Sequence, residues 1–558
     1  MTTRRRFLAN SGLAALGASS LRLPRLEAAP AFDIVLKGGL ILDGTGGPVF
    51  AADLAVSGDA IEAVGDISAE QGRRVLDVKG LCVAPGFIDI HSHSDRSIVV
   101  YPTADSRVRQ GITTEVTGNC GSSAAPITGS NAEEVRRWMG GDEGLRPDWT
   151  DVASYAARVE AERVSVNQAL LLGQGTIRQA VAGNQDRPLT SEEMARVLRL
   201  VDDGLDQGAW GVSTGLEYTP GRYTPTDEIV AMARLVARRG GLYASHIRNE
   251  EALLLESVAE AIEIGRRSGV RVEISHLKAA GRVNWDKQGP AIDLIESARR
   301  EGVGVLADAY PYGAYSTGLT ILFQNWALEG DTAALMARLA DPSTRQRIRR
   351  EVAVRVPQEP GGYDLIVISS VKTSANQRLV GKNMLQIAEA WGIDPDEAIL
   401  RLIQEESGSV SYVGHAMSAD NVDRVLSHPL VMVGSDGYSV APTGRAVLDR
   451  PHPRSYGAYA RVLQHYVRER KVLALPAAVR KMTSMPADQL GLRDRGRVAR
   501  GLKADLVVFD PSSVTEQSTF DNPQRYPVGI PHVLVNGVLV VENGAHTGAR
   551  PGRMLRRA

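Results

Sequence analysis

The sequence predicts an α/β protein: a parallel (β/α)8 barrel, or TIM barrel, with a small β-sandwich domain built from both ends of the chain and an insertion over the barrel mouth. In the middle of the chain, short apolar strands alternate with helical patterns, which is typical of parallel βα units. Both ends of the chain instead read as short strands separated by turns rich in glycine and aspartate. Several central strands end in histidine or aspartate, as expected for an active site at the C-terminal face of a barrel.

Length, charge and cysteine content limit the classes of protein to consider. With 558 residues the chain is too long for one simple core, so two or three domains are expected. The net charge of −1 provides no basic surface to attract nucleic acid or anionic lipid. Two cysteines are too few for a disulfide framework, and Cys82 lies in an apolar run typical of a buried thiol. We therefore expect a small-molecule substrate and no nucleic-acid partner, and the oligomeric state stays open.

The first 31 residues have the features of a twin-arginine signal peptide rather than of a folded segment. Three consecutive arginines at positions 4–6 precede a weakly apolar run over 12–18, and small residues follow at 28–31. No other segment of the sequence is apolar enough to cross a membrane as a helix. We expect export to the periplasm or secretion, with no membrane association once the signal is removed.

The strand and helix patterns also predict the domain boundaries. Residues 32–87 and 487–558 are expected to form the β-sandwich domain, and residues 88–486 the barrel. Within the barrel, apolar residues at helical spacing follow Ser191, which is expected to cap that helix. The alternation is interrupted at about 319–400, where a strand over 365–368 and a helix over 384–391 indicate the insertion.

Candidate metal ligands follow one another at the ends of predicted strands. His91 and His93 come at the end of an apolar strand, and because side chains alternate along a strand, both imidazoles point to one side. The further candidates, each at or just after a strand end, are Cys120, His246, His276 and Asp436. A single histidine at a strand end would more often have a structural role. Several candidate ligands at successive strand ends instead predict a divalent metal site.

These segments resemble the amidohydrolase superfamily and, within it, the D-aminoacylases, which are N-acyl-D-amino-acid deacylases. The combination of Gly-Asn-Cys-Gly with Tyr-Pro-Tyr and His-Pro-Arg is the most specific part of the resemblance. The matching segments span nearly the whole mature chain: 85–95, 111–121, 215–220, 243–250, 273–278, 308–319, 434–437 and 452–454. The chain departs from the family pattern at Ser94 and over 455–460, which bears on the substrate side chain more than on the chemistry.

The resemblance implies zinc-dependent hydrolysis of N-acyl-D-amino acids to a carboxylate and a free D-amino acid. A thiolate and two neutral imidazoles hold one Zn²⁺ tightly and leave a position for water. We assign this tight site to Cys120, His246 and His276. His91 and His93 would bind a second, weaker metal ion or assist in holding the first. Metal-activated water would attack the amide carbonyl, with Asp436 as the general base that takes the water's proton and the general acid that delivers it to the leaving amine.

The substrate carboxylate needs a cationic partner. Lys278 lies two residues beyond a predicted ligand, and Arg454 can pair with a carboxylate through two hydrogen bonds. Tyr310 and Ser316 supply neutral donors. These four match the family's substrate-binding positions by motif, and Met417 matches one further contact. Three other polar residues of the chain are expected only to pack: Glu217, Tyr312 and His415.

Two other interpretations stay open. The first is hydrolysis of related amides, such as dipeptides with a C-terminal D-residue or cyclic amides and imides. Binuclear cyclic-amide hydrolases of the superfamily usually bridge two metals with a carboxylated lysine, whereas Cys120 occupies the special ligand position here. The second is an exported binding protein that keeps the fold without the reaction, against which the complete set of ligands argues.

Overall fold

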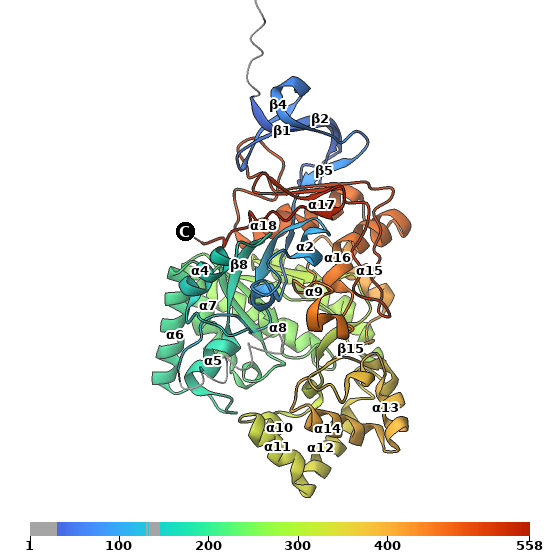
Figure 1. The fold of residues 1–558 in the computed structure, drawn as a ribbon. Helices are drawn as coiled ribbons and strands as arrows, with labels where there is room; N and C mark the ends of the chain where they lie inside the picture. The colour runs from blue at the N-terminus through green and yellow to red at the C-terminus, as the bar shows by residue number, and fades with distance from the viewer. Residues whose placement is uncertain (1–30, 130–131, 133–144, 558) are drawn as a thin grey trace, which may run out of the picture.

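The computed structural model describes residues 31–129, 132 and 145–557, which form three parts (Figure 1). A β domain lies at one end of the molecule, a (β/α)8 barrel in the middle and a largely helical insertion at the other end. The predicted fold class is thereby confirmed. Nearly all of the predicted signal peptide, residues 1–30, falls outside the described residues. No helix in the described part of the chain has both the length and the apolar character to cross a bilayer.

The barrel sheet has eight parallel strands in the order β16-β12-β11-β10-β9-β8-β7-β6. In chain order they are β6 (Phe87–Asp89), β7 (Ile112–Thr117), β8 (Asn167–Gly173), β9 (Gly211–Gly215), β10 (Leu242–His246), β11 (Arg271–Ile274), β12 (Val305–Ala309) and β16 (Val431–Val433). The sheet closes just beyond β6 and β16, where Ser92 pairs with Gly437 in a parallel bridge. Closure therefore brings two segments with predicted ligands side by side.

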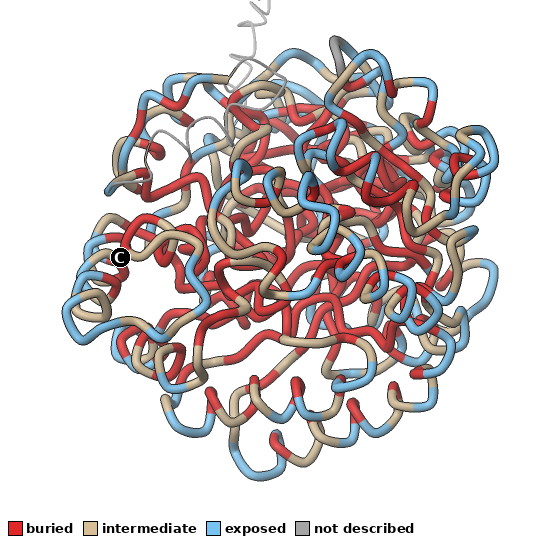
Figure 2. The backbone as a smooth tube through the Cα atoms, turned by 90° about the horizontal axis from the view of Figure 1, so that it is seen from below, coloured by how far each residue is buried: buried red, intermediate tan, exposed pale blue. Residues whose placement is uncertain are grey.

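Helices surround this sheet because each carries an apolar face that packs against the strands. Those around the barrel are α4 (Val152–Glu162), α5 (Gln174–Ala182), α6 (Ser191–Asp206), α7 (Thr226–Arg238), α8 (Leu254–Ser268), α9 (Gln288–Arg300), α15 (Ala419–Ser427) and α17 (Leu475–Met482). Further helices of the barrel region are α1 (Ser94–Ser97), α2 (Asp105–Val108), η2 (Gly221–Tyr223), η3 (Arg282–Lys287), η7 (Gly444–Leu448), α16 (Arg454–Arg461), η8 (Val462–Glu469) and α18 (Ser484–Leu490). Figure 2 shows buried backbone concentrated in the interior and exposed residues on the outer turns.

The start of α6 differs from the prediction in its capping residue. Ser191 is the first helical residue, and Thr190 is the N-cap. The Thr190 hydroxyl accepts from the Glu193 amide over 3.2 Å, and the Glu193 carboxylate accepts from the Thr190 amide over 2.8 Å. This reciprocal capping box satisfies two amides that the helix itself leaves without partners, which is why the helix is capped one residue earlier than predicted.

Both ends of the chain build the β domain, as predicted, and their nine strands share one hydrogen-bonded sheet. They are β1 (Phe32–Ile41), β2 (Phe50–Ser57), β3 (Ala60–Gly65), β4 (Gly72–Asp77), β5 (Cys82–Pro85), β17 (Leu506–Phe509), β18 (His532–Val535), β19 (Val538–Glu542) and β20 (Ala545–His546), with η1 (Ala69–Gln71) before β4. The two halves join where β5 pairs antiparallel with β17. Cys82 is a free, buried thiol in β5, and burial raises its pKa to about 11.

The insertion contains a three-stranded sheet and a group of helices. Its strands are β13 (Tyr315–Gly318), β14 (Ile366–Val371) and β15 (Val410–Gly414). Its helices are η4 (Leu319–Leu322), α10 (Asn325–Leu328), α11 (Thr332–Ala340), α12 (Pro342–Arg355), η5 (Tyr363–Leu365), η6 (Gln377–Leu379), α13 (Met384–Trp391) and α14 (Pro395–Glu405). The unit thus extends on both sides of the predicted range of about 319–400, because β13 and β15 pair with each other over a long sequence separation.

Candidate metal centre

All six predicted ligand and acid–base residues lie at the C-terminal ends of barrel strands. His91 and His93 follow β6, and Cys120 follows β7. His246 is the last residue of β10, and the two others follow their strands: His276 after β11 and Asp436 after β16. Since the strands are parallel, these ends meet on one face of the barrel. All of these side chains are buried except that of His93, which is partly exposed.

Three of these residues have the left-handed backbone conformation that non-glycine residues seldom adopt. The φ angles are 51° at Cys120, 36° at His276 and 52° at Asp436. At each position the chain turns sharply just after its strand, and the side chain lies among the other candidate metal ligands. Such conformations persist only where the surroundings enforce them, and they cluster at functional sites. Gly118 shows how tight the turn is, because a Cβ added there would lie 2.0 Å from the Leu171 carbonyl oxygen.

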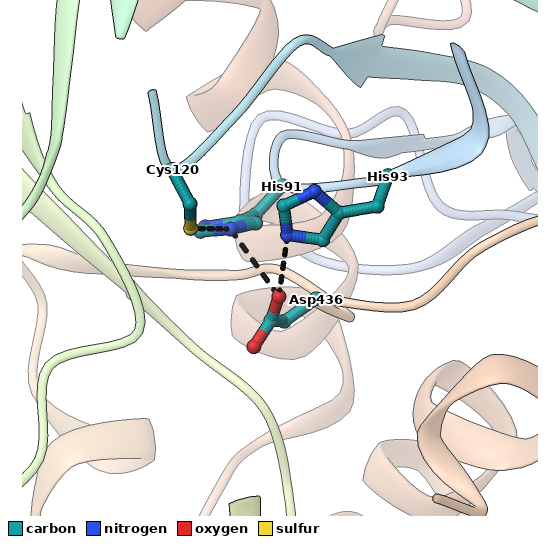
Figure 3. A group of neighbouring side chains, drawn as sticks. All are labelled: His91, His93, Cys120 and Asp436. Carbon is teal, nitrogen blue, oxygen red and sulfur yellow. Dashed lines mark hydrogen bonds and ion pairs between the residues drawn. The ribbon is translucent and has the colours of Figure 1, made fainter. Parts of the chain in front are cut away.

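One group of donors consists of His91, His93, Cys120 and Asp436 (Figure 3). The Cys120 sulfur lies 3.3 Å from His91 Nε2. An Asp436 carboxylate oxygen lies 2.9 Å from His93 Nε2 and 3.5 Å from His91 Nε2. The ligand atoms of all four residues lie within 4.8 Å of one another, a spacing that suits one shared cation.

A second group consists of Cys120, His246 and His276, so the thiol belongs to both groups. His276 Nε2 lies 3.5 Å from the Cys120 sulfur and 2.9 Å from His246 Nδ1. Burial by itself raises the pKa of the Cys120 thiol, but His91 and His276 outweigh it and hold this pKa well below its usual range. A thiolate together with imidazoles is the donor set that Zn²⁺ prefers, so these residues fit the metal that the sequence predicted.

Buried carboxylates hold the outward-facing nitrogens of three of these histidines. Asp308 lies 3.2 Å from His91 Nδ1, and Glu217 lies 3.1 Å from His246 Nε2. A Glu250 oxygen lies 3.0 Å from His276 Nδ1. Carboxylates in such positions fix the ring orientation and tautomer of a ligand histidine.

None of these three carboxylates was predicted from the sequence to be a functional residue. Glu217, expected only to pack, lies two residues beyond β9, and Glu250 lies four residues beyond His246. Asp308 is near the end of β12. Their positions at strand ends were the available signal. Each carboxylate, however, contacts a histidine that is distant in sequence, and the separations are 217 residues for Asp308–His91, 29 for Glu217–His246 and 26 for Glu250–His276. The other two residues expected to pack do so: Tyr312 and His415 both contact the Phe520 ring.

Four of the five predicted substrate-binding residues lie beside the candidate metal ligands: Lys278, Tyr310, Ser316 and Arg454. Lys278 Nζ is 2.6 Å from a Glu250 oxygen, and an Arg454 guanidinium nitrogen is 2.7 Å from Asp436. The Tyr310 ring centre lies 5.8 Å from Lys278 Nζ and 5.0 Å from the Arg454 guanidinium carbon. The Tyr310 hydroxyl is buried and has no hydrogen-bond partner among the described residues. Ser316 contacts Arg454 through its carbonyl oxygen, over 3.3 Å.

Met417, the fifth, lies in a different cavity from Ser316. This apolar cavity is lined by Leu277, Met417, Val422 and Val425, among others. A second cavity, which we call the acidic cavity, is lined by Glu217, Glu251 and Glu359 and includes Ser316 and Asp436. The two cavities share His276, Lys278 and Tyr310. A molecule held at these shared residues therefore has an apolar space on one side and a carboxylate-rich space on the other.

Comparison with known proteins identifies the family. A family model described as "Amidohydrolase family" matches residues 74–284 and 385–541, which is well over half of the chain. The chain belongs to the amidohydrolase family. This assignment agrees with the ligands at the strand ends and with the resemblance drawn from the motifs.

Among the relatives of this amidohydrolase, an N-acyl-D-glutamate deacylase of Alcaligenes xylosoxydans xylosoxydans is 37% identical over 94% of this chain and 96% of the relative. An N-acyl-D-glutamate deacylase from Bordetella bronchiseptica, solved with zinc and a phosphonate inhibitor that mimics the tetrahedral intermediate, is 35% identical with a TM-score of 0.79; the match covers 94% of this chain and all of that one. A D-aminoacylase described as having a binuclear metal centre is 34% identical, also with a TM-score of 0.79 and with coverage of 94% and 100%.

Proposed function

We propose that this protein is a zinc-dependent amidohydrolase that cleaves N-acyl-D-amino acids to a carboxylate and a free D-amino acid. The observation that carries the proposal is the convergence of Cys120, four histidines and Asp436 at one face of the barrel. Its relatives, at 34–37% identity over 94% of the chain, are named for deacylation of N-acyl-D-amino acids. The complete donor set favours an enzyme over a binding protein.

The donors divide between a tight and a weaker position. Cys120, His246 and His276 would hold the tight zinc, since a thiolate binds this cation most strongly. His91 and His93, together with the shared thiol, would hold a second ion more weakly. A bound zinc ion lowers the pKa of water toward 7 and polarises a carbonyl oxygen.

Asp436 has the position and the charge state of a general base. Burial by itself raises its pKa, but Arg454 and the neighbouring imidazoles outweigh burial and hold this pKa well below its usual range. The carboxylate is therefore ionised at neutral pH and ready to accept the proton of the attacking water. The same group then gives that proton to the amine nitrogen as the C–N bond breaks, so the acyl group leaves as a carboxylic acid and the amino acid as a free amine.

Lys278 and Arg454 would hold the substrate's α-carboxylate, with Tyr310 between them. The Tyr310 hydroxyl, buried without a partner among the described residues, supplies a hydrogen bond that the bound carboxylate can accept. The donors, this clamp and the two cavities then fix three substituents of the substrate's α-carbon, which makes the site chiral. The names of the relatives favour the D hand.

A substrate panel tests the proposal. Zinc-loaded protein should hydrolyse N-acetyl-D-methionine and other N-acetyl-D-amino acids, with much lower kcat/KM for the L enantiomers. Zinc content should be measured on the same preparation. Hydrolysis of none of the N-acetyl amino acids, at full zinc occupancy, would contradict the proposal, and a preference for the L series would contradict the D assignment.

We further infer that the protein is exported through the twin-arginine route to the periplasm or beyond. The run of arginines at 4–6, the apolar run at 12–18 and the small residues at 28–31 support this. Replacing Arg4, Arg5 and Arg6 with lysine should retain the protein in the cytoplasm of the expressing bacterium. Unchanged export of that variant in a cell fractionation experiment would contradict the inference.

A further inference from the structure

A cluster of charged groups around Arg355 borders the acidic cavity, and of these only Glu217 also serves the candidate metal centre, through His246. Arg355, at the end of α12, points its guanidinium at three carboxylates. One nitrogen of this guanidinium lies 3.1 Å from Glu251, 3.5 Å from Glu359 and 3.7 Å from Glu217. Glu217 and Glu251 line the cavity from the barrel loops and Glu359 from the insertion, so the insertion completes one wall. Arg355 contacts these carboxyl groups without itself lining the cavity.

This wall is rich in hydrogen-bond acceptors, because three carboxyl groups surround one guanidinium. Glu251 is held as a carboxylate, since Arg355 outweighs the effect of burial and lowers its pKa. Burial and the charge of Glu251 raise the pKa of Glu359 well above its ordinary value, and the Tyr315 hydroxyl is hydrogen-bonded to this carboxyl group. Arg355 is therefore already saturated and offers no free positive charge to an incoming carboxylate.

The position of the cavity indicates what would enter it. It reaches from Glu251 and Glu359 to Lys278, Tyr310 and Asp436, the proposed carboxylate clamp and general base. Tyr310, whose hydroxyl has no hydrogen-bond partner within the described part of the chain, also lines it. The neighbouring apolar cavity suits an acyl chain, which has no polar atoms beyond its carbonyl, so the substituent left for the acidic cavity is the amino-acid side chain.

We propose that the acidic cavity binds the substrate side chain and selects D-residues whose side chains donate hydrogen bonds or carry positive charge, such as lysine, arginine and glutamine. Side chains ending in a carboxylate are disfavoured, because they would face the Glu251 carboxylate, and Arg355, the cation beside it among the described residues, is already paired. The proposal rests on the proposed deacylase function. It sets this chain apart from its relatives that are named for N-acyl-D-glutamate.

Pairs of substrates with matched shapes test the proposal on the zinc-loaded protein. N-acetyl-D-glutamine and N-acetyl-D-glutamate differ only in the terminal group, and N-acetyl-D-lysine and N-acetyl-D-norleucine differ only in the terminal ammonium. We expect kcat/KM to favour glutamine over glutamate and lysine over norleucine, each by about tenfold or more, as for one charge-assisted hydrogen bond. A preference for glutamate, or equal use of lysine and norleucine, would overturn the selectivity while leaving the deacylase function intact. Hydrolysis of none of the four would instead contradict the proposed function itself.

A variant links the selectivity to this wall. Glu251→Gln should lower the ratio of kcat/KM for lysine over norleucine by about tenfold, because it removes the carboxylate and leaves Arg355 less neutralised. Glu256→Gln is the control: it makes the same change of charge five residues away, at an exposed position of α8. An unchanged ratio in folded Glu251→Gln would overturn the assignment of this wall. If that variant does not fold, the substrate pairs on the parent protein still decide the selectivity.

Discussion

Cys120 is the donor that the two candidate metal groups share, and its backbone explains why. It lies between two glycines that follow β7, and its φ of 51° turns the thiol toward His91 and His276. The sulfur thus reaches donors that follow β6 on one side and β11 on the other. One residue with a left-handed backbone therefore connects both ligand groups.

Replacing Cys120 with alanine should remove the tight zinc and nearly all hydrolysis. The two remaining imidazoles lose the thiolate, which is the strongest zinc ligand of the three. Zinc content by elemental analysis and the rate with N-acetyl-D-methionine check this, and Cys82→Ala, at the other free cysteine, is the matched control. Stoichiometric zinc and full activity in Cys120→Ala would show the assignment to be wrong.

Asp436→Asn should keep the fold and bind metal, but lose most of the rate. An amide cannot take the proton from water, and the loss of a general acid–base group typically costs about 10²–10⁴-fold in rate. The comparison needs kcat and zinc content from the same preparation. A variant that works at the parent rate would mean that another group transfers the proton.

Arg454→Ala should mainly raise KM for N-acetyl-D-methionine, with a smaller decrease in kcat. The clamp holds the α-carboxylate in ground and transition states alike, and losing one charge-assisted contact costs about 1.5–3 kcal/mol. Lys278→Ala should behave similarly. N-acetyl-D-methionine amide, which lacks the carboxylate, is the control: it should be a poor substrate for the parent and little affected by the substitution. Equal use of acid and amide by the parent would disprove the clamp.

The helix α6 illustrates how a barrel helix is delimited by its first turn. Its apolar residues face the sheet, with Val197, Val201 and Leu205 buried, and periodicity alone predicts this face. Its start depends on the side chain that accepts hydrogen bonds from the free amides. Thr190 and Ser191 are both chemically suitable caps, and the structure selects Thr190 because Glu193 then stands at the position that completes the capping box.

Thr190→Ala should therefore destabilise the first turn of α6, by about 1 kcal/mol. Hydrogen exchange of peptides covering residues 190–197 measures this directly, since local opening exposes these amides. Ser191→Ala, one residue along, removes a hydroxyl that does not cap the helix and should change the exchange much less. Equal effects of the two substitutions would contradict the assignment of the cap.

The C-terminal segment joins the β domain to the end of the barrel opposite the metal centre. The Leu555 amide donates to the Gln168 carbonyl over 2.7 Å, and Gln168 donates to Arg553 over 2.9 Å. The Trp210 indole donates to the Leu555 carbonyl over 2.7 Å. Gln168 lies near the start of β8, and α18 packs at the same end, where its apolar residues join the barrel interior. In Figure 1, α18 accordingly lies between the barrel and the β domain.

Removing residues 550–558 should lower thermal stability while leaving the metal centre intact. The deletion removes the hydrogen bonds just described and exposes Trp210 and the barrel end, but it touches none of the donors. A lower unfolding temperature is expected, with zinc content and KM close to those of the parent at low temperature. A truncated protein as stable as the parent would show that the contacts of this segment with the barrel do not contribute to stability.

The sequence by itself determined the fold class and indicated the strand-end residues that we propose as metal donors. Each proposed donor lies at or shortly after the end of a barrel strand, and parallel strands place their ends together, so the local pattern indicated His91 and Asp436. Cys120 needed in addition the resemblance of its Gly-Asn-Cys-Gly motif to the family. Only the tertiary structure decided which groups surround them. Glu217 beside His246, and Arg355 among the carboxylates of the acidic cavity, depend on contacts between distant segments, and no sequence spacing encodes those. A strand end is a local property of the chain, whereas the charge balance of a cavity arises only when barrel and insertion pack together.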